Sequence, residues 1–255
     1  MNEMNEDEQS PENDLCIGKN AVLEAFRSKK TVDKLYLLDG ASDAVMTSIK
    51  REAKKQGTLI KFMTKERLDA MAGTPKHQGA VAMCAAYHYA EVQDMLDAAK
   101  EAGEPLFLIL LDGIEDPHNL GAILRTADVV GAHGVIIPKN RAVGLTSTVA
   151  KASAGALHYV PVAKVTNLGQ TIDELKKQGL WFVCAQMDGT LMYELNLTGA
   201  IGLVIGAEGQ GVSRLIQEKC DMLASIPMKG HIGSLNASVA AGVLSYEIAR
   251  RRLFG

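Results

Sequence analysis

The sequence predicts an α/β protein whose carboxyl-terminal part is built on a mostly parallel sheet. Three observations lead to this fold class. Residues 106–111 read Leu-Phe-Leu-Ile-Leu-Leu, an apolar run with the length of a buried strand. Apolar residues then recur at helical spacing over 119–131, and a second apolar run follows at 135–137. Similar runs and helical patterns alternate to the end of the chain, which is typical of a parallel sheet covered on both faces.

Before this part, shorter patterns predict a small α/β module. We expect its helices at 17–27, 42–56 and 64–71, the last with Thr64 as a candidate cap, and its strands at 35–38, 59–63 and 79–86. A polar helical stretch over 91–102 is broken at 103–105, and we place the domain boundary there. The predicted organisation is therefore a disordered acidic tail at 1–14, a small α/β module at 15–88, a linker at 89–104 and a larger domain at 105–255.

The larger domain continues the alternation of strands and helices. Strands are expected at 106–111, 134–137, 159–162, 181–184, 201–205 and 222–226, and helices at 119–131, 146–154, 168–178, 212–219 and 237–252. We see no internal repeat in this pattern. Parallel strands bring their carboxyl ends to one edge, so the loops that follow them are the first place to look for a site.

Charge is distributed unevenly along the chain. The formal net charge of the 255 residues is −3, yet the first fourteen residues hold six acids and no base. Residues 18–90 hold thirteen Lys or Arg and seven Asp or Glu, which gives that segment a formal charge of +6. A basic module favours a polyanionic partner, and a well-solvated helical surface is an equally good explanation.

The four cysteines, Cys16, Cys84, Cys184 and Cys220, are far apart in sequence. No Cys-x-x-Cys pair and no histidine pair at metal spacing occurs, so we predict reduced, mostly buried thiols and no metal site. The sequence has no signal peptide and no apolar stretch long enough to span a membrane. These features predict a cytoplasmic protein without a membrane partner.

Three loops carry polar side chains that could do chemistry. The first, 112–119, ends at Asn119, which is a candidate helix cap, and Arg125 interrupts the apolar helix that follows. The second, Gly-Ala-Glu-Gly-Gln-Gly at 206–211, can bring backbone N–H groups to a ligand. It is neither Gly-x-Gly-x-x-Gly nor followed by Gly-Lys-Ser/Thr, which disfavours a dinucleotide or NTP phosphate site. A tight turn with a solvated Glu208 is the alternative.

The third loop, 226–238, leads from a strand into the last helix. Ser234, Asn236 and Ser238 crowd the start of that helix, one more side chain than capping requires. The helix is rich in small residues, which suits a close-packed interface. None of the three loops holds a nucleophilic cysteine, a Ser–His–Asp set or a metal cluster. Amides, hydroxyls, one Arg and one Glu suit a reaction of positioning and charge stabilisation.

Three segments together resemble the motifs of the SpoU/TrmH (SPOUT) family of RNA 2′-O-ribose methyltransferases. They are Asp-Pro-His-Asn-Leu-Gly-Ala-Ile-Leu-Arg-Thr-Ala at 116–127, Ile-Gly-Ala-Glu-Gly-Gln-Gly at 205–211, and Ile-Pro-Met with Ser-Leu-Asn-Ala-Ser-Val-Ala at 226–240. More weakly, 18–25 and 77–82 resemble the ribosomal-protein-like RNA-binding module of many members. Segments 151–156 and 160–168 are similar to the bacterial large-subunit rRNA guanosine methyltransferases.

The resemblance implies several properties that the residue patterns do not predict. It implies a deep trefoil knot in the SPOUT domain, where periodicity alone predicts an ordinary doubly wound sheet. It implies S-adenosylmethionine as the cofactor, and homodimerisation through the carboxyl-terminal domain with the final helix in the interface. By motif match, the cofactor would lie against Gly206, Gly211, Ile226, Met228 and Leu235.

The same resemblance implies a catalytic set, namely Asn119, Arg125, Glu208, Ser234 and Asn236. The family assigns the residue at Arg125 as general base, but a guanidinium stays protonated and has no acceptor site. We favour a cationic Arg125 that orients the RNA phosphate and stabilises the developing alkoxide, while phosphate or water takes the proton. The expected partner is rRNA. Alternatives are a tRNA ribose methyltransferase, a non-catalytic RNA-binding relative, and a nucleotide-dependent oxidoreductase, which the absent glycine fingerprint disfavours.

Overall fold

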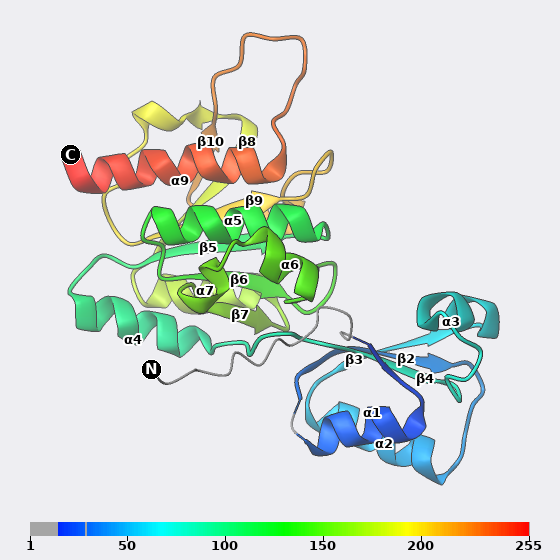
Figure 1. The fold of residues 1–255 in the computed structure, drawn as a ribbon. Coiled ribbons are helices and arrows are strands. Elements are labelled where there is room, and N and C mark those ends of the chain that lie inside the picture. The colour runs from blue at the N-terminus through cyan, green and yellow to red at the C-terminus, as the bar shows by residue number, and fades with distance from the viewer. Residues whose placement is uncertain (1–14, 29, 255) are drawn as a thin grey trace, which may run out of the picture. The chain divides into compact units, whose positions relative to one another are not determined.

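The structure is a computed structural model that describes residues 15–28 and 30–254. The predicted acidic tail at 1–14 lies outside the described residues. By its internal contacts the chain forms two compact units, which divide between Tyr87 and His88, with Leu145–Ser147 grouped with the first unit. Each unit is an α/β structure with its own sheet (Figure 1).

The first unit is a four-stranded mixed sheet in the order β1-β4-β2-β3. Its elements are β1 (Leu15–Ile17), α1 (Lys19–Arg27), β2 (Val32–Leu38), α2 (Ala44–Lys55), β3 (Leu59–Met63), α3 (Lys65–Ala72) and β4 (Ala80–Cys84). α1 and α2 bury Val22, Phe26, Met46 and Ile49 against one face of the sheet. Leu68 of α3 is buried in a smaller cluster with Tyr36 and Val81.

The second unit is a six-stranded sheet in the order β10-β8-β9-β5-β6-β7, in which every pairing is parallel. Its strands are β5 (Phe107–Asp112), β6 (Gly134–Pro138), β7 (Val162–Val165), β8 (Trp181–Leu191), β9 (Ile201–Gly206) and β10 (Met222–Ser225). Its helices are α4 (Val92–Ala102), α5 (Pro117–Val129), α6 (Ser147–Ala152), η1 (Ala156–His158), α7 (Leu168–Lys177), η2 (Met192–Glu194), α8 (Arg214–Gln217) and α9 (Ala237–Phe254). The expected α/β fold with a parallel sheet is confirmed.

Helices cover both faces of this sheet, which explains why its strands are apolar along their whole length. On one face, α4, α7 and α8 form a core with the strand residues Leu108, Leu110 and Val204. On the other face, α5 and α9 pack against each other, and they lie side by side in Figure 1. The Arg252 guanidinium of α9 lies 5.0 Å from the centre of the Phe107 ring. The two-sided cover buries the central strands β5 and β9 almost completely.

Residues 89–104, which the sequence analysis assigned to a linker, are instead part of the second unit. They contain α4, and Met95 and Ala99 on one side of this helix are buried in the core of that unit. The polar composition of the segment suggested a connection, but its few apolar residues lie on one face of a helix. Gly134 allows the close packing, because a Cβ there would lie 2.4 Å from the Met95 sulfur.

Two other local expectations were inaccurate. The start of the predicted helix at 17–27 is a short strand, β1, and α1 begins only after Gly18, whose φ is +97°. The strand predicted at 159–162 begins later, as β7, because the preceding residues form the turn of η1. The trefoil knot implied by the resemblance stays a prediction.

Candidate active site at the carboxyl edge of the parallel sheet

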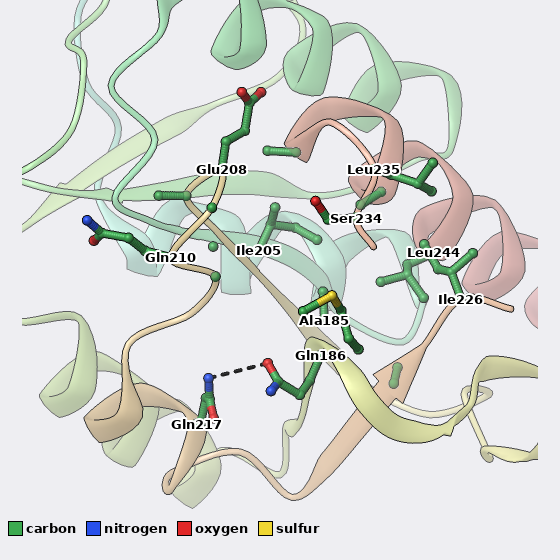
Figure 2. A pocket seen from close by; sticks show the side chains of 18 of the residues that line it. Ala185, Gln186, Ile205, Glu208, Gln210, Gln217, Ile226, Ser234, Leu235 and Leu244 are labelled. Atoms are coloured by element: carbon green, nitrogen blue, oxygen red, sulfur yellow. Dashed lines mark hydrogen bonds between the residues drawn. The ribbon is translucent and has the colours of Figure 1, made fainter. Parts of the chain in front are cut away.

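A cavity of about 240 Å³ lies at the carboxyl edge of the sheet of the second unit. Its walls come from the middle of β8, the end of β9 with the loop that follows it, the end of α8, the segment after β10 and the first half of α9 (Figure 2). The predicted cofactor residues all line it: Gly206, Gly211, Ile226, Met228 and Leu235. The sequence motifs therefore meet at the carboxyl ends of the parallel strands, where ligand sites of such sheets commonly lie.

The glycine loop after β9 is a tight turn that forms one wall of the cavity. Ala207 and Gly211 form a bridge, with Gly211 N donating to Ala207 O at 2.8 Å. A Cβ at Gly206 would lie 2.0 Å from the carbonyl carbon of Gly211, so only glycine fits there. Gly209 and Gly211 have φ values of +77° and +67°, which glycine adopts without strain. The loop is thus both the tight turn and the cavity wall that the sequence offered as alternatives.

A three-residue hydrogen-bond network ties this loop to two helices. Asn119 Nδ2 donates to Glu208 Oε1 at 2.8 Å, and Asn236 Nδ2 donates to Asn119 Oδ1 at 2.9 Å and also to Glu208 Oε1. Asn119 is buried at 7% exposure, whereas Glu208 is exposed, so the network runs from the protein interior to the surface. Three predicted catalytic residues from α5, the glycine loop and the start of α9 are therefore in direct contact.

Asn119 is not the cap of α5. The N-cap is Asp116, whose side chain accepts from His118 N at 3.0 Å, and Pro117 occupies the first helical position. This arrangement leaves the Asn119 amide free to face Glu208. The alternative role considered for Asn119 from the sequence alone is thus filled by another residue.

Ser234 and Arg125 complete the predicted catalytic set in different ways. Ser234 lines the cavity, and its hydroxyl makes no hydrogen bond within the described part of the chain. Arg125 is exposed on α5 and does not line the cavity. Over residues 15–28 and 30–254 it has no hydrogen bond or ion pair, so this cation is available to an external anion. The structure brings four of the five residues together and leaves Arg125 apart.

The wall contributed by β8 and α8 was not predicted from the sequence. Gln186 and Gln217 lie across the cavity from the Glu208 side chain, with Gln217 Nε2 3.4 Å from Gln186 Oε1 (Figure 2). Gln217 Nε2 also donates to Val212 O at 2.6 Å. The pairing of β8 with β10 shifts register, because Leu223 pairs with Cys184 and Ala224 with Thr190. Residues 185–189 of β8 are therefore left out of this pairing, and 185–187 line the cavity. The signal was available, since 185–187 also follow a predicted strand of the parallel sheet.

The chemistry of the cavity wall fits a sulfonium cofactor. Its lining contains one carboxylate, Glu208, and neither Lys, Arg nor His. A cation is tolerated in such a pocket, whereas a phosphate would find no positive partner. Ile205, Ile226 and Leu244 offer apolar surface for a purine, and the two glutamine amides and Ser234 offer polar contacts. Within the described residues, no group of three His, Cys, Asp or Glu could hold a metal ion, and no helix is long and apolar enough to cross a membrane.

Comparison with known proteins matches both parts of the chain. Residues 106–246 match the SpoU rRNA Methylase family, and residues 15–90 match the RNA 2′-O ribose methyltransferase substrate binding domain. YacO of Bacillus subtilis, whose name places it in the TrmH family of tRNA/rRNA methyltransferases, is 49% identical over 95% of this chain and 98% of that protein. A TrmH family protein of Staphylococcus haemolyticus is 46% identical over 93% of this chain and 96% of its own length.

Solved structures agree with these sequence matches. The SpoU methyltransferase AviRb from Streptomyces viridochromogenes, in complex with AdoMet, is similar with a TM-score of 0.60 and 25% identity. The similarity covers 94% of this chain and 91% of AviRb. The TrmH/SpoU tRNA modifying enzyme of A. aeolicus is similar with a TM-score of 0.53 and 29% identity, over 62% of this chain and 84% of that enzyme.

Proposed function

The chain belongs to the SpoU rRNA Methylase (TrmH) family of S-adenosylmethionine-dependent RNA 2′-O-methyltransferases, and on that premise we propose that it methylates the ribose 2′-hydroxyl of a guanosine in large-subunit rRNA. The observation that carries the proposal is the cavity with its glycine loop, held by the Asn119–Glu208–Asn236 network. The basic first unit, which matches a substrate-binding domain, is the proposed RNA-holding part.

Gly206, Gly211, Ile226, Met228 and Leu235 would hold S-adenosylmethionine in this cavity. When bound, the cofactor supplies a methyl group on a sulfonium, which is already a strong electrophile. The chain therefore has to place the ribose oxygen in line with the methyl group and help it lose its proton. Glu208 keeps the pocket compatible with a positive ligand, and the apolar walls keep competing water out.

Arg125 would act from outside the cavity as a fixed cation. The ribose hydroxyl that would receive the methyl group has to lose its proton. Arg125 orients the neighbouring RNA phosphate and stabilises the developing alkoxide, while that phosphate or water takes the proton. Its exposure and its lack of a partner among the described residues 15–28 and 30–254 support this role, since a guanidinium used within its own fold would be paired.

Asn119, Glu208, Asn236 and Ser234 would then shape the site. Glu208 accepts from both asparagine amides, which fixes the glycine loop relative to α5 and α9. Ser234 is adjacent to Leu235 and turns its hydroxyl to the cavity (Figure 2), where it can contact the methionine part of the cofactor. Loss of one such polar group in a preorganised site costs roughly 3–4 kcal/mol of barrier.

The role of Arg125 can be tested with Arg125→Lys and Arg125→Ala. We expect Arg125→Ala to lower kcat/KM by roughly 100-fold or more, and Lys to restore part of the activity without changing the pH profile, because both side chains stay cationic. Exposed Arg214, on α8, supplies the matched control Arg214→Ala. A Lys variant whose activity rises with pH toward the lysine pKa would instead support the general-base role.

A tRNA ribose and a non-catalytic RNA-binding role are the alternatives. Similarity to an enzyme named for tRNA modification favours the first of these. Nucleoside mass spectrometry of rRNA and tRNA from a deletion strain distinguishes them. We expect one ribose-methylated guanosine to disappear from large-subunit rRNA. Unchanged rRNA with an altered tRNA profile would overturn the rRNA substrate, and two unchanged profiles would favour the non-catalytic relative.

A further inference from the structure

Four cysteines that are far apart in sequence fall into two neighbouring pairs in the structure. Cys16 Sγ lies 3.4 Å from Cys84 Sγ, although 68 positions separate them. Cys184 is in the core of the second unit, and Cys220 packs against the same core. The two pairs belong to different units, and their surroundings differ.

The first pair lies across two antiparallel strands. Cys16 of β1 is opposite Ala82 of β4, so Cys84 is its diagonal neighbour two residues further along β4. Both side chains therefore lie on the same face of the sheet. Cys16 is half-buried and Cys84 is 5% exposed. Cys16 is thus the more exposed residue of the pair and Cys84 the more buried one.

The surroundings make Cys16 the more acidic thiol. The side-chain hydrogen bond shared with Cys84, and then the positive charge of Lys30, outweigh the cost of burial and lower the pKa of Cys16 to about 6. The pKa of Cys84 is raised, first by its hydrogen bond to Cys16 and then by burial. The pair thus combines a half-buried thiol of lowered pKa with a buried thiol of raised pKa in direct contact, which is the arrangement of an attacking and a resolving thiol.

We propose that Cys16 and Cys84 form a redox-active dithiol site that hydrogen peroxide converts into a disulfide. The Cys16 thiolate attacks one peroxide oxygen, the O–O bond breaks, hydroxide leaves and takes up a proton as water, and Cys16 becomes a sulfenic acid. The Cys84 sulfur then attacks the Cys16 sulfur, the S–O bond breaks and the thiol proton leaves with the departing oxygen as a second water. Two thiols are oxidised and one peroxide is reduced.

The position of β1 makes closure of this bond feasible. The sulfurs must approach from 3.4 Å to the ~2.05 Å of a disulfide, and diagonal strand neighbours start farther apart than directly opposite ones. β1 has three residues and lies at the edge of its sheet, paired only with β4. The required movement falls on this short edge strand and leaves the central pairing of β4 with β2 in place.

The second pair provides an internal comparison. Cys184 is fully buried in the core beside Phe182 and Ile216, and its hydrogen bond with Cys220, followed by burial, raises its pKa. A buried neutral thiol reacts slowly with peroxide. Cys16 should therefore be oxidised before Cys184.

The test uses the full chain, reduced and then treated with graded hydrogen peroxide at pH 7. Remaining thiols are blocked with N-ethylmaleimide, and non-reduced peptides are mapped by mass spectrometry. We expect a Cys16–Cys84 linked peptide, lighter by two hydrogen atoms, to appear first and to vanish on reduction. Alkylation of Cys16 by iodoacetamide as a function of pH should have its midpoint near 6.

Two variants separate the attacking thiol from the resolving one. In Cys84→Ser, dimedone should trap a sulfenic acid at Cys16, whereas Cys16→Ser should leave Cys84 unmodified over the same time. The proposal is overturned if Cys184–Cys220 links first, if Cys16 goes to sulfinic acid in the unsubstituted chain without linkage, or if its alkylation midpoint lies near the ~8.5 of an ordinary thiol. These readouts do not depend on methyl transfer, so their outcome is independent of whether the proposed methyltransferase activity is confirmed.

Discussion

Asn236 uses both ends of its side-chain amide. Its Oδ1 accepts from Ser238 N at 2.9 Å and from Val239 N at 3.3 Å, which caps the start of α9. Its Nδ2 donates to Asn119 and Glu208. A single residue therefore fixes the beginning of the last helix and the glycine loop in one arrangement.

Replacing Asn236 with Asp should separate these two roles. The variant keeps the capping oxygen but puts a carboxylate where Nδ2 faced Glu208, so two like charges meet. We expect kcat/KM to fall about 100-fold, equal to about 2.7 kcal/mol, with little loss of helix content by circular dichroism. Asn167, which caps α7, gives the matched control Asn167→Asp, and equal losses in the two variants would contradict the network.

At Gly206 the neighbouring backbone leaves no room for a side chain. In Gly206→Ala the new methyl group should push residues 211 and 212 away from residue 206. We expect S-adenosylmethionine binding to weaken at least about tenfold, because overpacking of this kind costs roughly 1–3 kcal/mol. Isothermal titration calorimetry measures the change. Gly199→Ala is the control, since a Cβ there meets nothing within 4 Å, and unchanged affinity in Gly206→Ala would remove the glycine loop from the cofactor site.

At the scale of elements, α9 is anchored to its unit by charged groups near its end. Glu247 is 5% exposed, and its carboxylate accepts hydrogen bonds from Arg250 and Arg251. Arg252 donates to the carbonyls of Pro105, Leu106 and Gly199. The helix that begins at the site is therefore held at its far end as well.

Glu247→Gln should make this anchoring depend on pH. Arg250, and then Arg251, hold the pKa of Glu247 below its ordinary value. The carboxylate therefore stabilises the folded state above an unfolded pKa of about 4.3, and this contribution is lost as pH falls through the lower folded pKa. We expect Glu247→Gln to cost about 1–2 kcal/mol of unfolding free energy at pH 7, and the difference from the unsubstituted chain to shrink progressively below about pH 4.

Urea unfolding followed by the fluorescence of Trp181 measures this effect, because the chain's one tryptophan lies in the second unit. The control is Glu218→Gln, which removes an exposed pair with Arg214 and should change stability by less than about 1 kcal/mol. If Glu247→Gln lowers the free energy of unfolding by the same amount at every pH, then Glu247 stabilises the fold by packing and not by its charge.

The elements themselves followed from the sequence wherever burial was two-sided. The apolar runs of β5, β6 and β9 predicted strands within a residue of their observed limits. Short or kinked elements did not follow. β1 has only three residues, and β8 is interrupted by an excursion that depends on the path of β10. Such features are set by contacts between distant segments, which a local pattern does not contain.

At the scale of the whole molecule, the motifs predicted the cavity better than the individual contacts. All five predicted cofactor residues line it, but the network joining Asn119 to Asn236 spans 117 positions and could not be read from spacing. The pairing of Cys16 with Cys84 was missed for the same reason. Composition also gave no indication of Gln186 and Gln217, because amides have no characteristic motif.

The second unit also carries an exposed apolar groove, and we propose that a second copy of the chain covers it. It lies between the end of α5 and α9, and its lining includes Val129, Tyr246 and Leu253, which are 67%, 56% and 74% exposed. Exposed apolar side chains that gather in one groove are typical of an interaction surface. The resemblance to dimeric family members implies the same occupant.

Light scattering after size exclusion tests this dimer. We expect twice the chain mass of 27.3 kDa for the unsubstituted protein and a single mass for Leu253→Asp, because a buried carboxylate in the interface would be unpaired. Leu215 on α8 is also 74% exposed and lies outside the groove, so Leu215→Asp should stay dimeric. Monomeric unsubstituted protein would contradict the proposal.

The central claim is that the cavity and Arg125 together methylate a ribose oxygen of RNA. The most direct measurement is to incubate the purified chain with S-adenosylmethionine and protein-free large-subunit rRNA, digest the RNA to nucleosides and analyse them by mass spectrometry. We expect 2′-O-methylguanosine to appear, and to form at least about 100-fold more slowly with Arg125→Ala. A methyl group found on a base would contradict this claim. So would the absence of methylation on both protein-free rRNA and rRNA in assembled subunits, if calorimetry shows that the cofactor binds.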